Sequence, residues 1–215
     1  MGHKRPIVSW QPPADMTGPG ARLLLVIGCP RSGTRSFARM LSLAGIRVGH
    51  ERVGLHGTVS SYFAVDDTFY HGPHQSTKDK LRDFTFQHKW MLVRHPLKIV
   101  ASLHFGSPPQ NWWDWQMRHT GIDIRQGSLL ASASFVLRWT ELCEQGSPER
   151  VFRIEDWKQD WNEIANRLSI AVEPLPDFSH SNANNPKPSL SWNDVEQPFL
   201  RDGLKKLAEK HGYDV

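Results

Sequence analysis

The sequence predicts an α/β protein with a P-loop-type central parallel β-sheet that is flanked by helices. Three observations lead to this prediction. Short apolar runs at 22–28, 88–93 and 150–154 have the length and continuity of strands that are buried on both faces. Segments with helical periodicity lie between these runs, and strands that alternate with helices form parallel sheets with right-handed crossovers. The first run also ends at a glycine-containing loop, which leads directly into a helical segment.

The chain divides into an N-terminal arm and one domain. Its 215 residues suit a single α/β domain, and a hydrophobic content of 39% provides enough apolar material for one core. Residues 1–20 are rich in proline and glycine, which disfavour regular structure. We therefore expect a flexible arm over 1–20 and an α/β domain over 21–215.

The first helix of the domain follows the first strand after a short loop. It carries apolar residues at the i, i+3, i+4 and i+7 positions of one helix face: Phe37, Met40, Leu41 and Ala44. Gly45 comes next, and glycine is a common residue at the end of a helix.

The later elements alternate in the same way. Pro96 favours a helix start after the 88–93 strand, because a helix accepts proline at its first position. The apolar residues of the segment 128–145 recur with helical spacing, which predicts a longer buried helix. A helix with an apolar face from Trp157 to Leu168 follows the third strand, and a last helix is expected over 193–210.

Charge and cysteine content limit the classes of partner. The formal net charge of +4 at pH 7 and the pI near 9.2 fit an anionic ligand or substrate. The basic residues are scattered, which argues against a nucleic-acid partner. No apolar run approaches the roughly 18 residues that a membrane span needs. Two cysteines are too few for a disulfide framework, and no Cys/His set has zinc spacing, so we expect a cytoplasmic protein without a metal site.

The segment VIGCPRSGTRS, residues 26–36, has the position of a phosphate-binding loop. Gly28 and Gly33 have the spacing of the two glycines in a Walker A loop. Thr34, however, stands where that loop has its lysine, and Arg35 stands where it has the magnesium-binding Ser or Thr. These differences argue against an ATPase or a kinase.

The same loop also permits a cysteine phosphatase. Cys29 and Arg35 form a C-x5-R pattern that Ser36 follows, which resembles the low-molecular-weight protein tyrosine phosphatases. In such an enzyme a thiolate near a helix N-terminus attacks phosphorus, and an aspartic acid protonates the leaving group. Asp177 is the candidate for that acid. In the alternative interpretation, Cys29 is a small apolar residue that packs behind the loop.

The stretch PRSGT, residues 30–34, resembles the 5′-phosphosulfate loop of the sulfotransferases that use PAPS (3′-phosphoadenosine 5′-phosphosulfate). The arginine of this stretch, Arg31, makes the loop similar to the loops of tyrosylprotein sulfotransferases and their bacterial relatives. The resemblance implies transfer of a sulfuryl group from PAPS to an acceptor hydroxyl or amine, with PAP as the product and no metal. It also implies that the 5′ end is held by Arg31, Ser32, Gly33, Thr34, Arg35 and Ser36. Arg31 would in addition act in catalysis, because its charge lies where the bridging oxygen becomes negative.

A second motif agrees with this resemblance. The segment VRHPLKIVAS, residues 93–102, resembles the family's 3′-phosphate site, which has an arginine at a strand end and a serine eight residues later. Arg94 and Ser102 have this spacing. Because the carboxyl ends of parallel strands share one edge, where ligands bind, we expect Arg94 on the same edge as Arg31. Neither an ATPase nor a phosphatase needs this second site.

Two further segments resemble parts of the same family. The segment RVFRIEDW, residues 150–157, is similar to a strand that ends in R-Y-E-D-L. Ile154 stands where the family usually has a tyrosine against adenine, so the resemblance implies an aliphatic contact with the base.

The other segment is RVGHERVG, residues 47–54, which resembles the C-G-E-E segment of tyrosylprotein sulfotransferases, and His50 replaces the first glutamate. The resemblance implies that Glu51 is the general base that takes the acceptor proton. His50 is the rival base, because an ordinary imidazole titrates near pH 6.5 and many members of the family use histidine. The alternative without catalysis is a surface ion pair of Glu51 with Arg47 or Arg52.

The acceptor is the least defined part of this prediction. Residues 111–119 hold three closely spaced tryptophans, Trp112, Trp113 and Trp115. Aromatic surfaces suit sugar rings or phenols, so a glycan, a glycolipid or a small-molecule acceptor fits, and the same tryptophans equally fit core or interface anchors. A nucleotide-binding module that has lost catalysis is the alternative to an enzyme, and the oligomeric state stays open.

Overall fold

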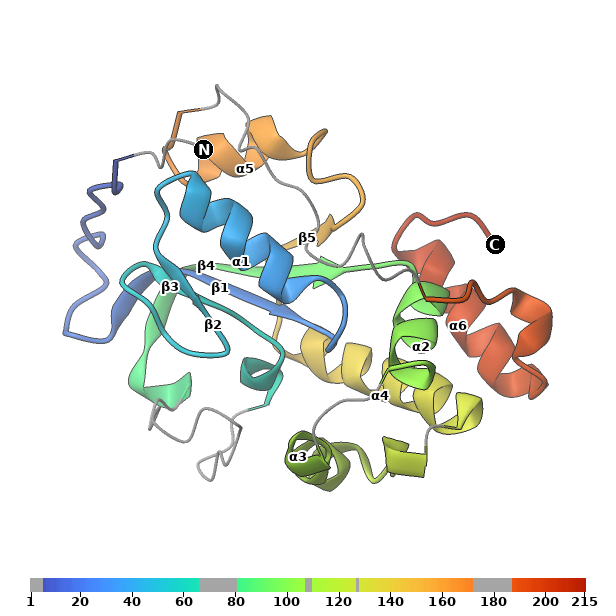
Figure 1. Cartoon of the computed structure of the whole chain (residues 1–215). Coiled ribbons are helices and arrows are strands. Elements are labelled where there is room, and N and C mark those ends of the chain that lie inside the picture. Colours follow the sequence, from blue (N-terminus) through green and yellow to red (C-terminus); the bar gives the residue numbers. More distant parts are fainter. Residues whose placement is uncertain (1–5, 66–80, 107–109, 127, 172–186) are drawn as a thin grey trace.

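The computed structural model describes residues 6–65, 81–106, 110–126, 128–171 and 187–215. These residues form one five-stranded sheet in the order β2-β3-β1-β4-β5, in which every neighbouring pair is parallel. The strands are β1 (Ala21–Gly28), β2 (Val48–His50), β3 (Gly57–Ser60), β4 (Thr85–Val93) and β5 (Arg150–Arg153). The predicted α/β fold with a central parallel sheet is confirmed (Figure 1).

Helices cover both faces of this sheet. They are α1 (Thr34–Leu43), α2 (Pro96–His104), α3 (Gln110–Thr120), α4 (Leu129–Gln145), α5 (Trp161–Arg167) and α6 (Pro198–Lys210). Figure 1 shows α1 and α5 on one side of the sheet and α4 on the other. The two layers of core follow this division, because one apolar cluster includes residues of α1 and α5 and the other includes residues of α2, α4 and α6.

Strand β1 shows why the first apolar run is continuous. Leu24 and Val26 belong to the cluster on the α1 side, whereas Leu25 and Ile27 belong to the cluster on the α4 side. All four side chains are at most 4% exposed. Since successive side chains of a strand point to opposite faces, a strand that is covered on both faces needs apolar residues at every position.

Two predicted helix starts, those of α2 and α4, are confirmed to within one residue, and two others are wrong. Pro96 is the first residue of α2, and Ser128 caps α4 by accepting a hydrogen bond from the Ala131 backbone N–H at 3.0 Å. The helix expected from Trp157 begins only at Trp161, because residues 154–160 form turns. The turns still bury Trp157, which is why it fits the apolar face.

The last helix also begins later than expected. A short 3-10 turn, Trp192–Asp194, occupies the start of the predicted 193–210 helix, and α6 begins at Pro198. The carboxylate of Asp194 accepts hydrogen bonds from both the backbone N–H and the hydroxyl of Ser191, which closes this turn as a separate unit.

The N-terminal segment lies against the domain. The Val8 backbone N–H donates to the carbonyl of Gly45 at 3.1 Å, and the Trp10 indole N–H donates to Gln87 Oε1 at 2.8 Å. Residues 6–20 form no helix or strand, and the expected division at residue 20 stays a prediction. Within the described residues, no helix has the length and apolar character to span a membrane.

Candidate functional site

The loop between β1 and α1, residues 29–33, connects the strand and the helix at the carboxyl edge of the sheet. Gly33 caps α1 with a φ of 100°, in the left-handed region that favours glycine. A Cβ at Gly33 would lie 2.8 Å from Cγ1 of Ile154, so the close approach of the two segments also requires glycine. Ile154 is 4% exposed and packs beneath the loop. Ile154, the residue that was predicted to contact the adenine base, is thus buried next to the loop.

The start of α1 presents backbone donors. The first intrahelical bond runs from the Phe37 N–H to the carbonyl of Gly33. The N–H groups of Thr34, Arg35 and Ser36 belong to the first turn, which has no preceding turn to supply acceptors. Among the described residues, no side chain caps these groups and no acidic residue lies in the first turn. This turn therefore carries the partial positive charge that binds anions.

Arg31 of this loop meets Arg94, an arginine from a distant segment of the chain. The Nε of Arg31 donates to Ser102 Oγ at 2.8 Å, and Arg94 Nη1 donates to the carbonyl oxygen of Arg31 at 3.2 Å. Arg31 has a φ of 75°, a strained conformation for a residue with a side chain. Within the described part of the chain, neither arginine forms an ion pair with a carboxylate. Burial and the charge of Arg94 both lower the pKa of Arg31, so an anion here would relieve an existing repulsion.

A cavity of about 540 Å³ opens between these arginines and the segment 187–190. Four cationic side chains line it: Arg31, Arg94, Lys98 and Lys187. Lys98 also pairs with Glu155 at 3.1 Å, and Lys187 donates to the carbonyl of Phe105 at 3.1 Å. The volume lies within the range of small-molecule sites, and the lining is strongly cationic.

Ser32 is fully buried, unlike its two neighbours in the loop, Arg31 and Gly33. Its backbone N–H already donates to the carbonyl of Cys29 at 2.9 Å. Its hydroxyl lies 2.7 Å from the position of a Cβ built on Gly28, and it has no hydrogen-bond partner in the described residues. The serine side chain therefore packs beneath the loop against the end of β1.

Cys29 lies in the apolar core cluster on the α4 side of the sheet and is 2% exposed. Burial raises its pKa well above the ordinary value, and the nearby Cys143 adds to this effect. A thiol in such surroundings stays protonated, whereas a nucleophilic cysteine needs a lowered pKa. Asp177, the candidate acid of a phosphatase, lies outside the described residues. The geometry therefore disfavours the phosphatase interpretation.

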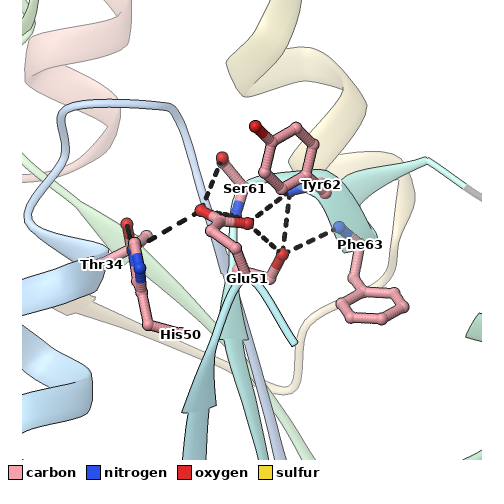
Figure 2. A network of polar contacts seen from close by, with 7 residues as sticks. Thr34, His50, Glu51, Ser61, Tyr62 and Phe63 are labelled. Atoms are coloured by element: carbon pink, nitrogen blue, oxygen red, sulfur yellow. Dashed lines mark hydrogen bonds and ion pairs between the residues drawn. The ribbon is translucent and has the colours of Figure 1, made fainter. Parts of the chain in front are cut away.

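Glu51 follows β2 and is buried at 8% exposure, with a φ of 55°. Its carboxylate accepts hydrogen bonds from the hydroxyls of Ser60 at 2.5 Å and Ser61 at 2.9 Å, and from the backbone N–H groups of Ser61 at 3.1 Å and Tyr62 at 3.3 Å (Figure 2). Burial raises the pKa of Glu51, and these hydrogen bonds act in the opposite direction. The structure therefore gives Glu51 partners at the end of β3, and not the surface pair with Arg47 or Arg52 that was the alternative to a catalytic role.

His50 connects Glu51 to the loop. Its Nε2 lies 3.3 Å from Thr34 Oγ1 and 3.6 Å from Glu51 Oε1 (Figure 2). The His50 side chain is 32% exposed, far more than Glu51 at 8%. The two candidate bases are thus neighbours at the same sheet edge, and His50, the more exposed of the two, contacts the first residue of α1.

Several site residues were not predicted from the sequence. Ser60 and Ser61 hold Glu51, and Lys98 and Lys187 extend the cationic lining of the cavity. Lys98 lies within the 93–102 motif, so its spacing from Arg94 was an available signal. The predicted aromatic segment 111–119 lies in α3, but the side chains of its tryptophans are outside the described part of the structure.

Comparisons of this chain with models of protein families, with curated proteins and with solved structures found no match. The chemistry of the residues described above therefore carries the functional inference.

Proposed function

We propose that this protein is a sulfotransferase that transfers a sulfuryl group from PAPS to an acceptor hydroxyl or amine. The main support is the meeting of the two motifs at one cavity, where Arg31 donates to Ser102 at 2.8 Å and Arg94 donates to Arg31 at 3.2 Å. The sequence separates these segments by more than sixty residues, and an anion with two phosphate groups is the ligand that would use both.

The residues present fit such a ligand. The open first turn of α1 and Arg31 suit the 5′ phosphosulfate, and Arg94 with Ser102 suits a 3′-phosphate. PAPS would supply an activated sulfuryl group. Arg31 would hold a fixed positive charge near the leaving oxygen, which typically contributes several kcal/mol to transition-state stabilisation. His50 and Glu51, at the neighbouring strand end, are the residues that could remove the acceptor proton.

The missing Walker residues also support this proposal. A sulfuryl transfer needs no magnesium, so Thr34 and Arg35 in place of lysine and Ser/Thr are compatible with it. A phosphatase would need a reactive Cys29, and its burial argues against this. The acceptor stays a small molecule, a glycan or a glycolipid.

The test is calorimetric binding of PAP, AMP and ATP, each with and without magnesium. We expect PAP to bind at least about tenfold more tightly than AMP, because a charge-assisted hydrogen bond contributes about 1.5–3 kcal/mol. Magnesium should not change the affinity for PAP. Arg94→Ala should remove the preference for PAP, whereas Arg39→Ala, which removes an exposed arginine of α1, should keep it. Equal affinities for PAP and AMP in the wild type would contradict the proposal.

A further inference from the structure

A second cavity lies over the face of the sheet that α4 covers, and it extends to Thr85, the first residue of β4. We propose that this cavity binds a small apolar molecule with one negative charge, such as a fatty acid, whose charged group pairs with Lys89. The inference goes beyond the proposed function, because the residues that line this cavity are different from those that line the cationic cavity at Arg31 and Arg94.

The size and the lining of the second cavity suit an apolar ligand. Its volume is about 570 Å³, which lies within the range of small-molecule sites. Side chains from both the sheet and the core cluster on the α4 side contribute to it. The main apolar side chains are Leu25, Ile27, Phe63, Phe84, Phe86 and Leu142. Three of these six are aromatic, and aromatic side chains provide large apolar contact areas.

The end of α4 explains why this part of the face is open. The last turn of the helix lines one side of the cavity, and the helix ends at Gln145. Gly146 follows so close to β1 that a Cβ there would lie 2.9 Å from Cδ1 of Ile27. The helix therefore stops at this point of the sheet. Residues of two 3-10 turns, Tyr62–Ala64 and Leu81–Asp83, line the space next to it.

Lys89 is at an unusual position for a charged residue. It pairs in register with Leu25, and register partners in parallel strands have their side chains on the same face of the sheet. Leu25 is 4% exposed and belongs to the core cluster on the α4 side. Positions on a covered face of a parallel sheet are normally apolar. Among the described residues that line the cavity, Lys89 is also the only charged one.

The charge of Lys89 matches one anionic group. Within the described part of the chain, no carboxylate pairs with its ammonium group, and no acidic residue lines the cavity. The Lys89 side chain is exposed, so its methylene groups can follow the apolar wall while the charge stays in contact with solvent. A ligand with an apolar body and one anionic group would use both the wall and the charge.

A polyanion fits this cavity poorly. One lysine and a largely apolar lining would leave the further charges of a molecule such as PAP without partners, and a buried charge without a partner is costly. The two cavities therefore differ in the class of anion that they suit.

The test uses octanoate as the probe and 1-octanol as its neutral counterpart. Binding to the whole chain is followed by NMR of isoleucine methyl groups, and Ile27→Val assigns the signal of Ile27. We expect both probes to shift this signal until saturation, because Ile27 lines the cavity. Lys89→Met keeps a long apolar side chain but removes the charge. It should weaken octanoate binding about fivefold, the size expected for a partly exposed ion pair, and leave octanol binding within about twofold.

Two further variants serve as controls. Lys206→Met removes the same charge from an exposed position of α6, and it should leave the affinities for both probes unchanged. Ala64→Trp places a large side chain in the cavity and should abolish binding of both probes. If Ala64→Trp does not fold, Ala64→Leu fills less of the cavity and should weaken the binding of both probes by a smaller factor.

Three results would overturn the inference. They are the absence of a saturable shift of the Ile27 signal with octanoate, an unchanged octanoate affinity in Lys89→Met, and an equal loss of affinity for octanoate and octanol in that variant. These measurements use neither PAP nor turnover. A protein that binds octanoate as expected but fails to bind PAP would contradict the proposed function alone.

Discussion

Cys29 shows at the scale of a single residue how burial decides between two chemistries. The C-x5-R pattern permits a nucleophile, but the thiol lies in the apolar core and its pKa is raised by burial. The pattern alone could not reveal this, because the side of the loop that a residue faces depends on how β1 packs against α4. Arg31 and Arg94 were predicted together because the carboxyl edge of a parallel sheet is a general feature of the fold.

A substitution at Cys29 tests this interpretation. Cys29→Ser should keep PAP affinity within about threefold, and the buried hydroxyl should lower the free energy of unfolding by about 1–3 kcal/mol. Calorimetry and urea unfolding measure the two effects. Rapid hydrolysis of 4-nitrophenyl phosphate by the wild type, abolished in Cys29→Ser, would restore the phosphatase interpretation.

The partners of Glu51 could not be predicted at the residue scale. Ser60 ends a strand of only four residues, GTVS, which has no apolar run to identify it, and Ser61 follows directly after that strand. Its burial comes from its place between β1 and β2, and this depends on pairing rather than on composition. The motif resemblance found Glu51, but its occupied carboxylate became visible only with β3 in place.

At the scale of elements, the contact between the α1 cap and Ile154, the residue that follows β5, fixes the loop. Gly33 has a left-handed φ, and Ile154 lies where a Cβ would point. We predict that Gly33→Ala lowers the free energy of unfolding by about 1–3 kcal/mol and weakens PAP binding, because backbone strain and a steric contact add up.

A double mutant separates these two causes. Gly33→Ala combined with Ile154→Ala removes the steric contact but keeps the strain, so the pair should be less destabilising than the sum of the single changes. Urea unfolding of all four proteins measures the difference. Strict additivity would show that the two residues do not interact.

The element boundaries show what periodicity can and cannot predict. The apolar positions from Trp157 to Leu168 were correctly assigned to the core, but the turns at 154–160 bury Trp157 without a helix. Periodicity reports which residues are buried, and several backbone conformations can bury the same residues. The Pro96 start of α2 was predictable because proline restricts the backbone directly.

At the scale of the whole molecule, buried histidines make the stability depend on pH. Burial lowers the pKa of both His56 and His211 below the ordinary value of 6.5. His56 is 3% exposed, and its Nδ1 accepts a hydrogen bond from the Arg47 backbone N–H at 2.9 Å, which requires a neutral nitrogen.

The sign of the effect follows from these lowered values. Near pH 6.5 the unfolded chain binds more protons than the folded chain, so stability is present above this pH and is lost as the pH falls below it. We expect the melting temperature to decrease as the pH is lowered from about 6.5. The decrease should be smaller in the double variant His56→Gln/His211→Gln. Calorimetry between about pH 8 and pH 5 checks this, and identical slopes for the two proteins would contradict it.

The central place of β1 has a consequence for the protein while it is being made. Its neighbour β3 ends at Ser60, but its other neighbour β4 ends only at Val93. While the ribosome adds residues 61–93, at about 5–20 residues per second, the nascent chain carries a strand that is apolar on both faces and lacks one partner. The unpaired edge of such a strand pairs readily with other chains, so we expect the nascent chain to be prone to aggregation during this interval. Lys187, which lines the cavity together with Arg31 and Arg94, is synthesised much later still, and the cationic cavity is therefore among the last features to form.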